Sequence, residues 1–373
     1  MSEKQYELFL ASIPGVGGRT IHKLMEYYGL PSCVYKALLH KNKGVKDILG
    51  EKRFGHATCL QQSFDVEERY EELRNKGIHI CSEREPEYPQ RLKHLKNPPY
   101  ILFYKGNMEC LSGPTVAMIG ARECSPYGAA MADSFGKALG AAGITVVSGL
   151  ARGIDGLSQN AALEGRGKTV AVLGCGVDIC YPRSNQELYE KILRDGGCIL
   201  SSFLPGVKPE KHFFPERNRI VAGLSDVVLV IEARLKSGTF ITVDMALEQG
   251  KNVYAVPGRL TDRLSDGCNY LLRQGAGIAL SPEDLLKEME LMTAGPNSDP
   301  DKEIGFFAKK TGTDKGERLS LIEEFLDYTP CSLDELTEKI GDLMERGKVI
   351  QELMDLVIEG RAKAYEGGFF GRV

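Results

Sequence analysis

Residues 146–155 read VVSGLARGID, an apolar run that enters a glycine-containing turn and continues into a helical pattern. A strand that ends in such a turn, followed by the first turn of a helix, presents backbone N–H groups that suit a phosphate. The stretch leaves open which phosphate is bound. It could belong to a nucleotide cofactor, to a small substrate or to a nucleic-acid backbone.

The sequence on both sides of this stretch repeats the alternation of short apolar runs with helical patterns. We expect strands at residues 116–119, 144–148, 169–173, 198–203, 227–231 and 253–256, and helices at residues 127–142, 185–193 and 242–249. Nearly continuous apolar strands that alternate with helices are typical of a parallel sheet covered on both faces. The fold class is therefore predicted to be α/β, with a doubly wound, Rossmann-like and mainly parallel sheet.

Four regions are expected along the chain. These are a small helical domain at 1–70, the sheet domain at 71–290, a polar linker at 291–316 and a C-terminal domain at 317–373. In the first region, a glycine hairpin at 15–17 precedes a helix with Ile21, Leu24, Met25 and Tyr28 on one face. That hairpin either presents N–H groups to a phosphate or is a simple tight turn between packed helices.

The C-terminal region combines helical patterns with a short hairpin. Ser332 and Glu335 have the spacing of a capping box, a helix is expected at 348–359, and two short strands should flank residues 367–368. These elements resemble a winged helix. Only Arg346, Lys348 and Arg361 are basic near its expected recognition helix, which argues against DNA reading there. Such modules also serve purely as protein-contact surfaces.

Composition excludes several classes of protein. The 373 residues carry a formal net charge of −4, so nucleic acid would have to bind at a local basic pocket. No apolar run is long enough to span a bilayer and no signal peptide begins the chain, which predicts a cytoplasmic protein without membrane insertion. The ten cysteines are scattered singly, so neither a metal site nor a disulfide framework is expected.

The glycine spacing at the expected strand ends argues against a dinucleotide cofactor. The dinucleotide fingerprint needs three glycines after the first strand and an acid after the second. Here the first strand leads into IGARECSPYG, the second into SGLARG, and no Walker A sequence is present. We therefore predict no cofactor.

The same turns offer cations beside neutral donors. Arginines follow successive strands or lie nearby, at Arg122, Arg152, Arg183, Arg217 and Arg219, and Tyr181, Phe213 and Phe214 are close to them in sequence. Arginine suits phosphate because its planar fork donates two parallel hydrogen bonds, and aromatic rings can stack on bases. Alternatively, Arg217 pairs with Glu216 on the surface and the two phenylalanines belong to the core.

No catalytic group stands out. Asp155, Asp178, Glu232 and Asp244 are near the expected turns, yet a general acid or base requires a geometry that the sequence does not give. The favoured interpretation of Asp155 is that it braces its turn by accepting backbone N–H groups, or pairs with Arg152. We predict no catalytic residue.

Several of these motifs together resemble the DNA-processing protein A family, DprA or Smf. They are VAMIGARECSPYG, VVSGLARGIDGLSQNAAL, TVAVLGCGVDICYPRSN, FPERNRIVAGLSDVVLVIEARLKSGTFITVDMALEQGKNVYAVPG and GCNYLLRQGA, which follow one another in the order seen in that family. The resemblance is dense over roughly residues 80–288 and weaker in the helical domain, which looks like a sterile-alpha-motif or helix-hairpin-helix domain, and in the winged-helix-like domain.

The resemblance implies a non-enzymatic binder of single-stranded DNA, usually a homodimer, that protects DNA strands in natural transformation and helps to load the RecA recombinase. Carried over by motif, the DNA-contacting positions are Arg122, Ser148, Gly149, Arg152, Arg183, Asn218, Arg219, Ser237, Gly238 and Thr239. Arg183 stands where the family commonly has lysine, which keeps the charge and changes the donor geometry. No dimer or RecA contact residues are transferred.

Two alternatives stay open at this point. The turn KSGTFIT occupies the place of the phosphate turn in nucleoside-monophosphate phosphoribohydrolases, which share a similar sheet, although it lacks their double glycine. The other alternative is a RecA-loading scaffold with incidental DNA contact.

Overall fold

The computed structural model describes residues 1–293 and, nearer the C-terminus, residues 322, 325–326, 330–341, 344, 346–365 and 368–372. The chain divides into two compact units, of which the first contains Met1–Cys124 and Ala132–Thr293. The predicted linker lies, from residue 294 on, outside the described residues.

The chain begins with a group of six helices. They are α1 (Glu3–Ser12), α2 (Gly18–Tyr28), α3 (Pro31–Leu39), α4 (Lys43–Leu49), α5 (Glu51–Ser63) and α6 (Val66–Asn75). The predicted apolar face of α2 is confirmed, since Ile21 and Leu24 are buried and Met25 and Tyr28 pack against the same core. The hairpin ahead of α2 contains Gly15 at a φ of +78°, a conformation that favours glycine.

A nine-stranded sheet forms the centre of the first unit. Its strands are β1 (His79–Ser82), β2 (Ile101–Gly106), β3 (Thr115–Gly120), β4 (Thr145–Ser148), β5 (Thr169–Val172), β6 (Cys198–Ser201), β7 (Val227–Glu232), β8 (Asn252–Ala255) and β9 (Gly277–Ile278), in the order β1-β2-β6-β5-β4-β3-β7-β8-β9. The seven strands from β6 to β9 run parallel, whereas β2 is antiparallel to both β1 and β6.

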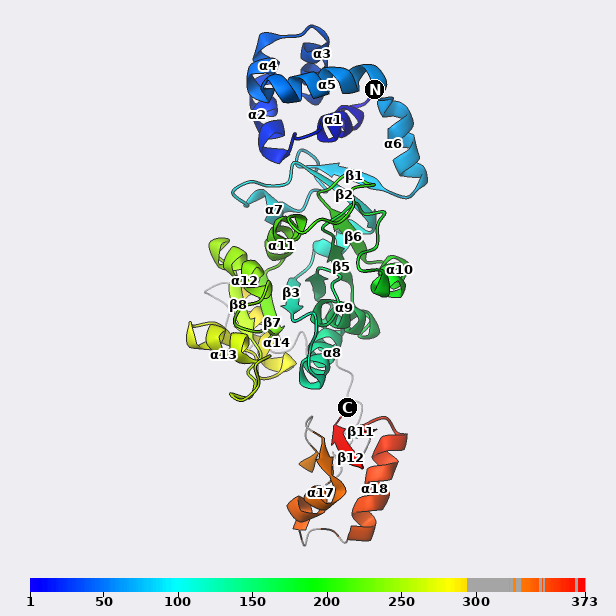
Figure 1. The fold of residues 1–373 in the computed structure, drawn as a ribbon, viewed down its shortest axis with the longest axis vertical. Coiled ribbons are helices and arrows are strands. Elements are labelled where there is room, and N and C mark those ends of the chain that lie inside the picture. The colour runs from blue at the N-terminus through cyan, green and yellow to red at the C-terminus, as the bar shows by residue number, and fades with distance from the viewer. Residues whose placement is uncertain are drawn as a thin grey trace. The chain divides into compact units, whose positions relative to one another are not determined.

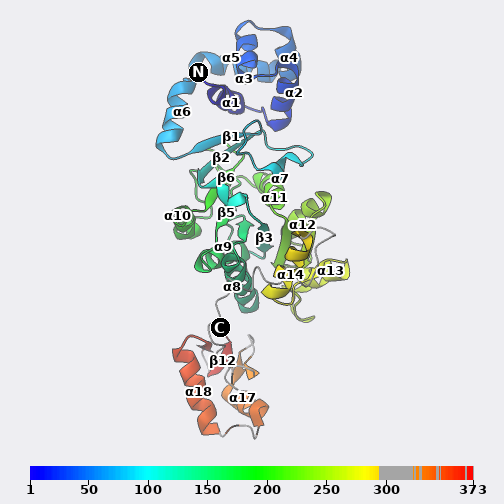
Figure 2. The same cartoon turned by 180° about the vertical axis from the view of Figure 1, so that it is seen from behind.

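Helices accompany both halves of the parallel sheet. Helices α8 (Pro126–Ala141), α9 (Ile154–Glu164) and α10 (Gln186–Arg194) lie beside the half that runs from β3 to β6, and α12 (Thr239–Glu248), α13 (Asp266–Arg273) and α14 (Pro282–Thr293) lie beside the half with β7 and β8 (Figures 1 and 2). Helix α11 (Phe213–Leu224) follows β6 and packs on α12. The predicted fold class is thus confirmed.

The six predicted strands are all present, because each is an apolar run whose residues are buried from both faces. Strands β1 and β2 were not predicted. They extend the sheet at an antiparallel edge, and their residues HICS and ILFYKG mix apolar with polar side chains.

The strand order reverses direction between β3 and β7. From β3 the chain adds β4, β5 and β6 on one side, and it then returns to add β7 and β8 on the other side of β3. In open α/β sheets a ligand binds outside the carboxyl ends of the strands at such a switch point. The turns after β3 and β7 are therefore the place to examine for function.

At the opposite ends of the same two strands, Arg91 ties the lead-in segment to the sheet. Its Nε and Nη2 donate to the two carboxylate oxygens of Asp226 at 2.7 and 2.8 Å, and its remaining donors reach the carbonyls of Leu111 and Gly113. Asp226 also accepts from the backbone N–H of Thr115 at the start of β3. This bidentate pair fixes the start of β3 against that of β7.

The second unit contains a three-stranded sheet of order β10-β12-β11, formed by β10 (Cys331–Ser332), β11 (Ala362–Tyr365) and β12 (Phe369–Arg372). Helices α17 (Leu333–Ile340) and α18 (Arg346–Ile358) share its core. The predicted capping box of Ser332 and Glu335 and the predicted C-terminal hairpin are both confirmed. The winged-helix assignment itself stays a prediction. In neither unit is any described helix both long and apolar enough to cross a membrane.

Replacing Arg91 with alanine is expected to lower the free energy of unfolding by about 2 kcal/mol, because charge-assisted hydrogen bonds are lost and the Asp226 carboxylate keeps only its links to Thr115. Urea unfolding followed by circular dichroism would measure the change. Arg74→Ala is the matched control, since Arg74 is exposed and pairs with Glu71 on its own helix. Equal midpoints for the two variants would contradict the assigned role of Arg91.

Candidate nucleic-acid interface

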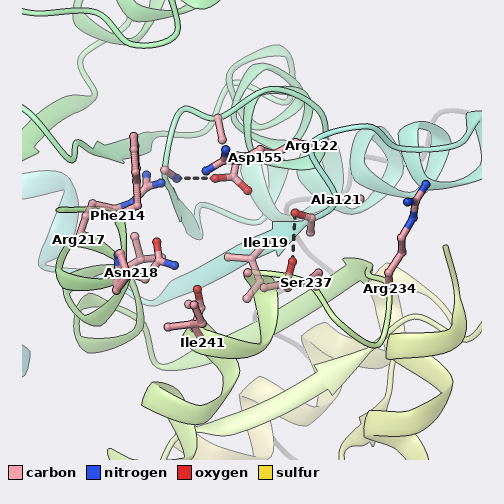
Figure 3. Close-up of a pocket in the computed structure, with 18 of the residues that line it drawn as sticks. Ile119, Ala121, Arg122, Asp155, Phe214, Arg217, Asn218, Arg234, Ser237 and Ile241 are labelled. Carbon is pink, nitrogen blue, oxygen red and sulfur yellow. Dashed lines mark hydrogen bonds between the residues drawn. The ribbon is translucent and has the colours of Figure 1, made fainter. Parts of the chain in front are cut away.

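A cavity of about 660 Å³ opens at the switch point. It is lined by the turns after β3, β4 and β7 and by one side of α11, as Figure 3 shows, with Phe214 and Arg217 from α11 on one wall and Ser237 and Ile241 on another. The lining residues are Ile119, Gly120, Ala121, Arg122, Glu123, Gly149, Ala151, Asp155, Tyr181, Lys211, Phe214, Pro215, Arg217, Asn218, Val221, Arg234, Ser237, Gly238, Thr239, Ile241, Thr242 and Leu264. Its volume is typical of ligand-binding sites.

The turn after β4 is held in place by three side chains. Asp155 Oδ2 accepts from the N–H of Gly149 at 3.2 Å, and Gln159 Oε1 accepts from the N–H of Leu150 at 3.1 Å. Asn185 donates to the carbonyls of Leu150 and Ala151, both at 3.0 Å. The prediction that Asp155 braces this turn is confirmed, and its partner is the backbone rather than Arg152.

Arg217 lies on the α11 wall of the cavity. Its side chain is buried, Nη1 donates to the carbonyl of Val172 at 2.8 Å, and the guanidinium lies so close to Gly149 that a Cβ there would be 1.7 Å from Nη1. Any side chain at 149 would displace it. The expected surface pairing of Arg217 with Glu216 is therefore wrong, because the helix turns Arg217 inward while Glu216 stays exposed.

Phe214 is flanked by two guanidinium groups. The Cζ atoms of Arg122 and Arg217 lie 5.5 and 5.9 Å from the centre of its ring, and the ring of Tyr181 lies at 5.7 Å. A cation within about 6 Å of an aromatic face is attracted to it. The ring is partly buried and lines the cavity, so it is not simply a core residue.

The turn after β7 forms the facing wall. Thr239 Oγ1 donates to the carbonyl of Gly120 at 3.3 Å and so joins this turn to the end of β3. Ser237 Oγ is buried and has no hydrogen-bond partner. Together with Asn218 from α11, this wall supplies polar groups opposite the arginines.

Six of the ten predicted contact residues line the cavity. They are Arg122, Gly149, Asn218, Ser237, Gly238 and Thr239. The cavity also has cations that the sequence analysis did not select, Lys211 and Arg234, both exposed. Lys211 stands three residues before Phe214 in KHFF. This basic–aromatic spacing is the feature of the sequence that indicates Lys211 as a candidate contact residue.

The other four predicted residues lie outside the lining. Ser148 is fully buried and donates to the carbonyl of Met118 at 2.6 Å, and Arg219 donates to the carbonyl of Asn97 on another side of α11. Arg152 and Arg183 are exposed on neighbouring segments. The turn at 174–176, which follows β5, does not line the cavity, and Gly174 instead packs against the Phe214 ring.

Burial raises the pKa of Asp155 above its ordinary value, against the opposing influence of Arg217 and of the N–H groups of Gly149 and Ala151. The carboxyl group takes part in no ion pair with a described residue. Its function in the turn is that of a hydrogen-bond acceptor.

Gly149→Ala is expected to lower the free energy of unfolding by about 1–3 kcal/mol, because the new methyl group must displace Arg217 or the turn. The control is Gly55→Ala in the exposed middle of α5, where a Cβ meets nothing within 4 Å and the substitution should stabilise by about 0.5–1 kcal/mol. Thermal melts of both variants would decide. A Gly149→Ala protein as stable as wild type would refute the close packing.

Asp155→Asn should change how stability depends on pH. A carboxyl group whose pKa is raised on folding contributes stability that is present below its unfolded pKa of about 4 and is lost as pH rises through the folded value. We expect the stability of wild type relative to Asp155→Asn to increase as the pH falls from 7 towards 4. Urea midpoints of both proteins over this range test it, and a difference that stays constant or has the opposite sign contradicts it.

Comparison with known proteins agrees with this geometry. The family model described as DNA recombination-mediator protein A matches residues 79–290. The DNA processing protein DprA of Streptococcus pneumoniae is 37% identical over 290 residues, which are 78% of this chain and 100% of that protein. Protein Smf of Escherichia coli is 35% identical over 301 residues, 80% of this chain and 78% of its own length.

Solved structures agree as well. The X-ray structure of DNA processing protein A from S. pneumoniae matches with a TM-score of 0.66 and 35% identity, covering 77% of this chain and 99% of that one. A Helicobacter pylori DNA processing protein A, whose structure concerns its single-stranded DNA binding mode, matches with a TM-score of 0.53 and 31% identity over 58% of this chain and 96% of its own. Since the family model spans more than half of the chain and the 37%-identical S. pneumoniae relative is covered over its whole length, this chain belongs to the DNA recombination-mediator protein A family, that of the DprA and Smf proteins.

Proposed function

We propose that this protein binds single-stranded DNA at the switch-point cavity, protects it, and helps to load the RecA recombinase in DNA uptake and homologous recombination. The family is described as a recombination mediator, and the H. pylori relative binds single-stranded DNA. The protein would act in the cytoplasm as a homodimer. The dimer and RecA contacts are parts of the proposal to which we assign no residues.

The observation that carries this proposal is the ring of Phe214 beside the guanidinium groups of Arg122 and Arg217, at the wall of a cavity lined by further cations. Proteins that hold single strands without sequence preference combine aromatic platforms, on which bases stack, with cations that follow the backbone. Tyr181, with 44% of its surface exposed, offers a second ring beside Phe214.

The cations of the cavity come from separate elements. Arg122 follows β3, Lys211 precedes α11 and Arg234 follows β7, and all three are exposed. Several cations on different turns suit a chain of phosphates better than one isolated phosphate. Arg152 and Arg183, exposed next to this site, would extend the contact with the strand. Arg219 and Ser148 are left out of the proposed contact, because neither lines the cavity.

The site favours binding over hydrolysis. Of the four carboxylates weighed as acids or bases, Asp155 is the one that lines the cavity, and its Oδ2 accepts the Gly149 N–H. Asp178 accepts from the N–H of Gly206, Glu232 is buried in β7, and Asp244 is exposed on α12. Glu123 also lines the cavity, but its carboxylate is exposed to solvent and lacks the buried, oriented position that suits a general acid or base. We therefore propose that the protein is not an enzyme.

The domain division is part of the same proposal. We assign residues 71–290 to DNA binding, the helices of 1–70 and the winged-helix-like 317–373 to accessory domains, and 291–316 to their linker. Helices α17 and α18 and the three-stranded sheet share one hydrophobic core, and Ser332 caps α17. This shared core supports an independently folded C-terminal domain.

Fluorescence anisotropy with labelled oligo-dT across a salt series tests the binding. We expect single-stranded DNA to bind more tightly than the duplex of equal length, with affinity that falls steeply with salt. Phe214→Ala should cost about 1–3 kcal/mol through lost stacking, and Arg122→Ala should weaken binding more than Arg183→Ala, since Arg122 lines the cavity.

Arg74→Ala on α6 serves as the control and should bind like wild type. Unchanged binding in both Phe214→Ala and Arg122→Ala would remove the cavity from consideration as the DNA site. Release of free base from a nucleoside monophosphate would instead support the hydrolase.

A further inference from the structure

Two residues that carry an unsatisfied buried polar atom line the same cavity. Among the described residues, five buried side-chain atoms lack a hydrogen-bond partner, namely Ser82 Oγ, Arg217 Nε, Ser237 Oγ, Gln249 Oε1 and Glu352 Oε2. Of these, Arg217 and Ser237 both line the switch-point cavity, from opposite walls (Figure 3). Buried polar groups are normally hydrogen-bonded, so a pair of exceptions in one cavity calls for a ligand with acceptor atoms.

Arg217 is the more informative of the two because it carries a charge. Only 4% of its surface is exposed, and its one hydrogen bond joins Nη1 to the carbonyl of Val172. No carboxylate of the described chain forms an ion pair with it. A guanidinium has five donors and stays protonated, so a buried one with a single bond is costly in the free protein.

The surroundings of Arg217 favour an anion over a neutral ligand. Burial lowers the pKa of Arg217, and the positive charge of Arg122 acts in the same direction, against the influence of Asp155. The two arginines flank the same ring, Phe214, and Asp155 directs an oxygen to the Gly149 N–H. An anion that entered beside Phe214 would relieve the repulsion between the two guanidinium groups.

We propose that Arg217 is an interior phosphate-binding residue, whose guanidinium binds a backbone phosphate of the single strand. This inference rests on the proposed function and adds that part of the backbone enters the cavity instead of passing over the exposed cations. The free protein keeps a destabilising buried charge, and bound DNA neutralises it.

Two consequences distinguish this role from that of a structural arginine. In Arg217→Met the buried charge is gone, so the melting temperature of the DNA-free protein should equal or exceed that of wild type. Its affinity for oligo-dT at low salt should fall about tenfold to hundredfold. The slope of log affinity against log salt should become shallower by about 0.7, the value for one phosphate on a single strand.

The test uses the full-length chain and compares wild type, Arg217→Met, Arg217→Lys and the control Arg74→Met by thermal melts without DNA and by anisotropy with oligo-dT at several salt concentrations. Arg217→Lys keeps the charge with shorter reach, so it should keep the salt slope and lose affinity at least about threefold. Arg74→Met should match wild type in slope, since Arg74 lies on the exposed surface of α6.

An Arg217→Met protein that binds oligo-dT with the wild-type salt slope would overturn the assignment, whatever its melting temperature. If Arg217→Met does not fold, the lysine variant decides, and unchanged affinity there overturns the assignment. Failure of wild type to bind oligo-dT at any salt concentration would instead refute the proposed function, which separates the two outcomes.

Discussion

The close approach of Arg217 to Gly149 is the constraint on which the rest of the site depends. The guanidinium lies against the α-carbon of Gly149, while Asp155 holds the N–H of the same residue. Arg217 therefore contacts both the turn after β4 and the ring of Phe214, and the three are packed together on one side of the cavity. A glycine is required at 149 because no Cβ fits there, although its backbone conformation is an ordinary one.

The sheet places this arrangement at its switch point. Arg91 and Asp226 fix β3 against β7 at their amino ends, and the bond from Thr239 to Gly120 joins the same strands at their carboxyl ends. The two neighbours at which the chain reverses its winding are thus linked at both ends. The cavity between their turns is a consequence of strand order, and its chemistry is set by the residues on those turns.

The strands and most contact turns could be predicted because buried parallel strands are unbroken apolar runs and the turns follow them directly. The directions of the side chains on α11 could not be predicted in this way, because consecutive residues of a helix point about 100° apart. All three charged residues at 216, 217 and 219 could lie on the surface as far as the sequence shows. In the structure Glu216 is exposed, Arg217 is buried, and Arg219 donates to the carbonyl of Asn97. Strands β1 and β2 were missed because polar side chains interrupt their short apolar runs.

The side chains that brace the turn after β4 hold its main-chain N–H and carbonyl groups, so the shape of the turn does not depend on the exposed cations of the cavity. Gln159 and Asn185 hold N–H and carbonyl groups, whereas Arg122, Lys211 and Arg234 project from the surface. Exchanging those exposed cations during evolution leaves the backbone scaffold untouched. A substitution of an exposed cation therefore changes the charge of the cavity and keeps the hydrogen bonds that hold this turn.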